Sequence, residues 1–103
     1  MFFFTNKNYA AYKKAKELLF TYYNNENYAE LYFSLAINLN LINEVLSSDI
    51  LIKSDNVKVH RIFFQKIFNL NVLEGYLIKE YLKYSLEKFP KDEYLESLLL
   101  KLD

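Results

Sequence analysis

The single histidine is the residue of this chain with the clearest potential for chemistry. His60 shares a predicted helix face with Phe63 and Ile67, so we interpret it as a hydrogen-bonded residue of the core or of its boundary. A Ser-His-Asp arrangement can be drawn from Ser34, His60 and Asp55, but no nucleophile-elbow motif accompanies it. Zinc needs three or four convergent ligands, and the absence of Cys excludes thiolate sites and disulfides. The sequence therefore predicts no catalytic and no metal-binding residues.

The acidic residues give no stronger indication of a reaction. Asp92, Glu93 and Glu96 gather at a predicted helix start, where capping and the helix dipole explain them. One glycine in 103 residues is too few for a Gly-rich phosphate loop. We therefore expect a non-enzymatic protein without a cofactor or a small-molecule ligand.

Four lysines, Lys7, Lys13, Lys14 and Lys16, precede the first acidic residue, Glu17. This basic segment could contact nucleic acid. However, the formal net charge is zero, whereas a general nucleic-acid binder needs a basic field. Twelve Lys against one Arg also disfavour bidentate recognition of phosphates and bases. Nucleic-acid binding through these four lysines is therefore the alternative hypothesis.

The composition is that of one folded helical domain spanning residues 1–103. Apolar residues make up 52% and charged residues 25% of the chain, which are globular values. One Gly and one Pro are too few for the many turns of an all-β protein. The abundance of Asn, Lys, Tyr, Phe and Ile indicates an AT-rich genome.

No segment of the sequence is expected to enter a membrane. The longest apolar helix contains Asn38, Asn40, Asn43 and Glu44, each costly in lipid. The apolar start MFFFTNK lacks the basic region and the length of a signal peptide. We therefore expect a cytoplasmic location, in a cell or in an infected host cell.

Apolar periodicity predicts a five-helix bundle made of two helical hairpins and a C-terminal capping helix. Asn27 with Glu30, and Asn71 with Glu74, have the spacing of helix N-caps. Residues 47–56 are predicted to be a loop whose apolar tripeptide either fills a gap beneath it or forms an exposed contact. The predicted helices cover residues 8–23, 27–47, 56–69, 72–88 and 92–102.

The predicted helix around Tyr28–Leu46 is apolar on nearly every side, and four companion helices are too few to cover it. Tyrosine is abundant, with ten copies, and it suits interfaces because its ring is apolar and its hydroxyl is polar. The three N-terminal phenylalanines either pack on the bundle or contact a partner. The predicted interface residues are Phe2, Phe3, Phe4, Tyr9, Tyr12, Tyr22, Tyr23, Phe33, Ile37 and Leu41.

Two segments resemble parts of tetratricopeptide repeats. YYNNENYAELYFSLAINLN (Tyr22–Asn40) has an aromatic pair, a polar turn, and a helix with Ala29 and Ala36 seven residues apart. EYLKYSLEKFPKDEYLESLL (Glu80–Leu99) is similar to the end of a repeat, with Pro90 after a helix. The resemblance implies helical hairpins that bind proteins or peptides. The spacing exceeds the 34-residue period and the turn glycine is missing.

NYAELYFSLAINLNLINEVL, followed by a loop and VHRIFFQKIF, resembles HEPN-type helical domains. Such domains are often dimeric and occur in toxin–antitoxin and antiviral systems. Their ribonuclease motif places His four to six residues after Arg. Here Arg61 instead follows His60, so the resemblance implies a protein without that ribonuclease activity.

The sequence thus favours a non-enzymatic protein–protein interaction module. More specific forms of this hypothesis are a homodimer and a phage or viral inhibitor or adaptor that acts on a host complex. The alternative is a nucleic-acid-associated or HEPN-like helical protein.

Overall fold

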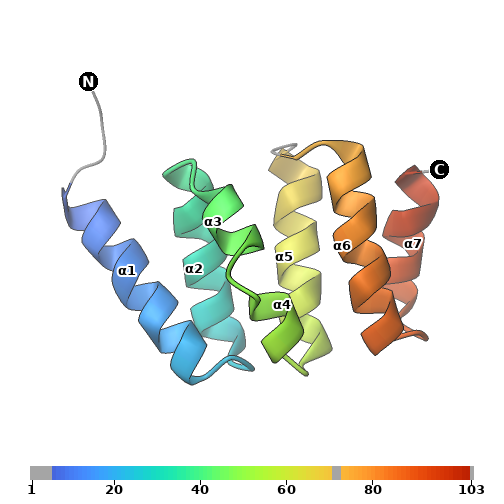
Figure 1. Cartoon of the computed structure of the whole chain (residues 1–103), viewed down its shortest axis with the longest axis horizontal. Helices are drawn as coiled ribbons and strands as arrows, with labels where there is room; N and C mark the ends of the chain where they lie inside the picture. Colours follow the sequence, from blue (N-terminus) through green and yellow to red (C-terminus); the bar gives the residue numbers. More distant parts are fainter. Residues whose placement is uncertain (1–5, 71–72, 103) are drawn as a thin grey trace.

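A computed structural model describes residues 6–70 and 73–102, and within these ranges the chain forms helices without strands. This part of the chain has five long helices and two short ones, whose arrangement is drawn in Figure 1. The long helices are α1 (Asn6–Thr21), α2 (Glu26–Asn38), α5 (Val57–Leu70), α6 (Gly75–Lys88) and α7 (Glu93–Leu102). The short helices are α3 (Ile42–Leu46) and α4 (Ile50–Lys53). The predicted all-α fold class is confirmed.

The long helices follow one another in chain order along the longest axis of the molecule (Figure 1). The pairs α1–α2, α5–α6 and α6–α7 are antiparallel, whereas α2 and α5 run in the same direction. This parallel pair is possible because α3 and α4 return the chain across one face before α5 begins. The Cα atoms extend over 40 × 29 × 18 Å, so the molecule is a flattened row of helices.

A row of contacting aromatic rings runs through the core from α1 through α2 to α5. Tyr12 stacks on Tyr32 with ring centroids 5.4 Å apart, and Phe33 meets the edge of Phe63 at 5.2 Å. All four side chains are fully or almost fully buried. Helix α2 packs against α1 on one side and α5 on the other, so both of its apolar faces are covered within the chain.

The predicted single helix over 27–47 is wrong because the chain turns at Asn40. Asn40 adopts a left-handed backbone conformation with φ 61°. Its amide donates to the Ile37 carbonyl (3.1 Å), and the Leu41 amide donates to the Ala36 carbonyl (2.7 Å). These two bonds form a Schellman motif, which satisfies the last carbonyls of a helix and ends it. Asparagine suits the left-handed position better than most residues.

We expect Asn40→Ala to lower the free energy of unfolding by about 1 kcal/mol, because a Cβ-bearing residue without a local hydrogen-bonding group disfavours this conformation. Asn40→Gly should be neutral or stabilising, since glycine adopts positive φ without steric cost. Chemical denaturation checks both values. Asn38→Ala is the matched control, because Asn38 is exposed and lies within α2. An equal loss at both positions would contradict the role given to the turn.

The segment predicted as the loop 47–56 contains a one-turn helix, α4. The expectation that its apolar tripeptide fills a gap is confirmed for Ile50 and Leu51, which are buried. The third member, Ile52, is 56% exposed. Asp49, directly before α4, has φ 63°, and this second left-handed residue separates α3 from α4.

Two helix starts differ from the prediction. The Asn25 side chain, rather than that of Asn27, caps α2 by accepting the Tyr28 amide at 2.9 Å. The predicted cap Asn71 lies outside the described residues, and α6 begins at Gly75.

Gly75 falls in the interior of the predicted helix 72–88, but in the structure it is the first residue of α6. A Cβ built there would meet only Leu102 Cδ2, at an ordinary 3.9 Å. Close approach of a neighbouring helix therefore does not explain this glycine.

The predicted cap of the last helix is confirmed. Asp92 Oδ2 accepts the Leu95 amide at 3.0 Å, and the Asp92 carboxylate also pairs with Arg61 of α5. Asp92 thus joins the start of α7 to α5. Among the helices of residues 6–70 and 73–102, none has the length and apolar character needed to cross a bilayer.

Candidate functional site

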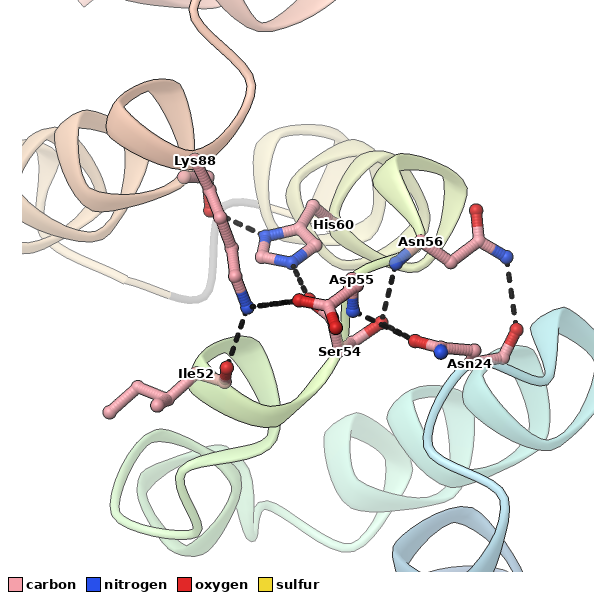
Figure 2. Close-up of polar contacts among 8 residues, drawn as sticks. Asn24, Ile52, Ser54, Asp55, Asn56, His60 and Lys88 are labelled. Carbon is pink, nitrogen blue, oxygen red and sulfur yellow. Dashed lines mark hydrogen bonds and ion pairs between the residues drawn. The ribbon is translucent and has the colours of Figure 1, made fainter.

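His60 is fully buried between a backbone carbonyl six residues before it and a serine hydroxyl 25 residues after it in the chain (Figure 2). Its Nδ1 lies 2.7 Å from Ser85 Oγ on α6, and its Nε2 lies 2.9 Å from the Ser54 carbonyl oxygen. A carbonyl can only accept, so Nε2 carries the proton and Nδ1 accepts from the Ser85 hydroxyl. The surroundings thus select one neutral tautomer.

Lys88, the last residue of α6, also binds the segment between α4 and α5 that contains Ser54. Its Nζ donates to the carbonyls of Ile52 (2.6 Å) and Ser54 (2.8 Å). It also lies 3.2 Å from an Asp55 carboxylate oxygen. The last carbonyls of α4 lack partners within their helix, and the lysine supplies both a donor and a favourable charge for them.

Asn24, in the turn between α1 and α2, completes the network. Its Oδ1 accepts from Ser54 Oγ (3.0 Å) and from the Asp55 amide (2.8 Å). Its carbonyl accepts from Asn56 Nδ2 at 2.9 Å. We call this network the His60 junction; its residues are Asn24, Ile52, Ser54, Asp55, Asn56, His60, Ser85 and Lys88 (Figure 2). It ties the α1–α2 turn, the α4–α5 connection and α6 together.

The contact between Ser85 and His60 has the reach of a serine–base pair. Both side chains and Ser54 are completely inaccessible to solvent, however, so a substrate could not reach the hydroxyl without displacing the α4–α5 connection. Ser34 bonds to Glu30 instead of the imidazole. The structure therefore does not assemble the drawn Ser34, His60 and Asp55 arrangement. We infer a structural role for the junction.

Burial lowers the pKa of His60, and the positive charge of Lys88 lowers it further. The bond to the Ser54 carbonyl and the nearby Asp55 carboxylate act in the opposite direction, and the net shift is downward. The folded protein thus resists protonation of this imidazole more than the unfolded chain does.

We expect the free energy of unfolding to fall as the pH drops below about 6.5, the pKa of an unperturbed histidine. The unfolded chain then binds a proton that folded His60 does not yet accept, and the loss continues until the pH reaches the lowered folded pKa. The slope cannot exceed about 1.4 kcal/mol per pH unit for one proton. Urea denaturation between pH 7.5 and 5.5 measures it. His60→Gln should abolish this slope, and an unchanged slope would assign it to other groups.

The four lysines considered for nucleic-acid binding are not equivalent. Lys16 lies 3.2 Å from the Glu44 carboxylate on α3, which also accepts from the buried Tyr12 hydroxyl at 2.7 Å. The Tyr12 bond and Lys16 together lower the pKa of Glu44. Lys7, Lys13 and Lys14 are exposed on α1. The predicted patch is therefore reduced to three outward lysines and one that joins α1 to α3.

The predicted interface residues also separate into groups. Tyr9, Tyr22 and Tyr23 are exposed. Tyr12 and Phe33 were predicted to meet a partner but are fully buried in the core, because α2 has a helix on each side. Ile37 and Leu41 are half-buried and pack against the core. Phe2, Phe3 and Phe4 lie outside the described residues.

A hollow that the sequence did not predict lies between the α3–α4 segment and α6. It has a volume of about 320 Å³ and is open to solvent on one side. We call it the α4–α6 cleft; it is lined by Val45, Leu46, Asp49, Ile50, Leu51, Ile52, Phe63, Glu80, Tyr81 and Tyr84. The sequence carried two signals of it, the apolar tripeptide in the predicted loop and the abundance of tyrosine.

Residues 6–70 and 73–102 bring no three His, Asp or Glu side chains together as metal ligands. Comparisons with protein families, characterised proteins and solved structures gave no match.

Proposed function

We propose that this chain is a protein-binding module that receives side chains of a partner in the α4–α6 cleft. The observation that carries the proposal is the apolar lining of this cleft together with the exposure of Ile52 at its rim. Apolar surface around a concave site is a common feature of binding sites. Tyr81 and Tyr84 add aromatic rings, which are enriched in protein interfaces.

The arrangement of the helices supports the same proposal. If α3 and α4 are taken together as one interrupted helix, the chain alternates in direction from α1 to α7 (Figure 1). Helical hairpins stacked in this way are the architecture of repeat proteins, which use their extended surfaces to bind other proteins. The partner can be a different protein or a second copy of this chain.

A photo-crosslinking amino acid at position 52 tests the proposal, with position 65 on α5 as the control, because Gln65 is exposed and does not line the cleft. In an extract of the native cell, position 52 should yield one defined adduct and position 65 none. The mass of the adduct distinguishes a foreign partner from a second copy.

Ile52→Ser should weaken formation of that complex about tenfold, as expected for a rim anchor. Its thermal stability should hardly change, because Ile52 is already exposed. Leu31→Ser, at another exposed apolar position, should have no effect on binding. Absence of an adduct at position 52, or equal weakening by both substitutions, would overturn the proposal.

A further inference from the structure

The charges at the rim of the α4–α6 cleft indicate what its partner must carry. Asp49 and Glu80 are the only charged residues in the lining, and both are acidic. They come from opposite walls, Asp49 directly before α4 and Glu80 from α6. Within the described part of the chain, neither carboxylate is in an ion pair, in contrast to those of Glu30, Glu44, Asp55 and Asp92.

A partner that covers the cleft also removes water from these two carboxylates. Burying a charge without a counter-charge is costly, so an acidic or uncharged occupant would bind poorly. An occupant with cations on both sides of an apolar anchor would pair with both carboxylates while its anchor enters the cleft. Lys53 and Lys83, four and three residues along the chain from Asp49 and Glu80, are exposed. Neither they nor Lys79, which directly precedes Glu80, line the cleft.

We propose, building on the proposed function, that the occupant is a cationic amphipathic segment of a partner protein. Its apolar side chain lies against Ile52, Tyr81 and Tyr84, three lining residues that keep exposed surface. Lysines or arginines flanking this side chain pair with Asp49 and Glu80. An anionic segment of the same apolar pattern is rejected, because it would bring like charges together in a site from which water is excluded.

Two synthetic peptides provide the probe. They share the same leucine and phenylalanine positions at helical spacing, and their remaining positions are all lysine in one and all glutamate in the other. Fluorescence anisotropy gives the affinity of each for the full chain, and amide chemical shifts locate the bound peptide. The lysine peptide should shift the amides of residues 49–52 and 80–84, and it should bind at least tenfold more tightly than the glutamate peptide.

Asp49→Asn and Glu80→Gln should each weaken binding of the lysine peptide about fivefold at low salt, the effect of one partly exposed ion pair. Added salt should reduce the difference. Glu17→Gln is the matched control, because Glu17 is exposed on α1, away from the cleft, and it should leave the affinity unchanged.

Equal binding of both peptides, shifts outside the cleft, or equal weakening by all three substitutions would overturn the inference. The crosslinking experiment keeps this failure separate from failure of the proposed function. If the adduct at position 52 still forms after both rim carboxylates are substituted, the cleft is the binding site but its partner need not be cationic.

Discussion

Replacing Phe33 by alanine is expected to lower the free energy of unfolding by about 3–5 kcal/mol, the cost of a large cavity in a well-packed core. The side chain is fully buried and contacts the rings of Tyr32 and Phe63, with centroids 5.6 and 5.2 Å away. It lies where α2 meets α5, so neighbouring helices cannot close the gap without losing their other contacts. Since small domains are stable by only about 5–15 kcal/mol, the variant should be close to unfolding.

Urea denaturation followed by circular dichroism measures this loss. Leu31→Ala is the control on the same helix, because Leu31 is 47% exposed, and it should cost less than about 1 kcal/mol. If Phe33→Ala does not fold, Phe33→Leu keeps the test open, with an expected loss of about 1–2 kcal/mol. Similar losses for Phe33→Ala and Leu31→Ala would contradict the core position and return Phe33 to the surface where the sequence had placed it.

The long helices could be predicted because apolar residues recur at helical spacing along each of them. The turn at Asn40 could not, because the apolar pattern continues past it through Ile42 and Val45, which are also buried. Only the left-handed backbone of one residue ends α2. The chain contains eleven asparagines, most of them in other roles, so the residue type alone does not indicate this break.

The same argument explains why Tyr12 and Phe33 were assigned to an interface. Periodicity shows which positions are apolar but not how many neighbours a helix has. Helix α2 has α1 and α5 on opposite sides and α3 beside it. A helix that appears to have surplus apolar faces can therefore bury most of them against its own chain.

For the His60 junction, the sequence indicated the burial of the histidine but not its partners. An apolar helix face around a single polar residue predicts a buried, hydrogen-bonded side chain, and this prediction is confirmed. Ser85 lies 25 residues further along the chain, and the Ser54 carbonyl is a backbone group that no residue type reveals. The α4–α6 cleft could not be predicted for the same reason. Its two walls, the α3–α4 segment and α6, are separated in the sequence and come together only in the folded chain.

His60→Ala is expected to lower the free energy of unfolding by about 2–4 kcal/mol, because it leaves a cavity and breaks two buried hydrogen bonds. The Ser85 hydroxyl loses its acceptor, and the Ser54 carbonyl keeps only the Lys88 ammonium as a donor. The loss of local stability should be largest in the α4–α5 connection, which the His60 junction holds in place. Hydrogen exchange should therefore accelerate in residues 52–60 before it does in α1.

A double-mutant cycle with Ser85→Ala separates the histidine–serine bond from the loss of packing. Ser85→Ala alone should cost about 1–2 kcal/mol, since it leaves buried Nδ1 without a donor. In the His60→Ala background the same substitution should cost close to nothing, which gives a coupling energy of about 1–2 kcal/mol. Strictly additive losses would show that the two residues act independently. The junction would then owe its stability to Lys88 and Asn24, which hold the α4–α5 connection without the imidazole.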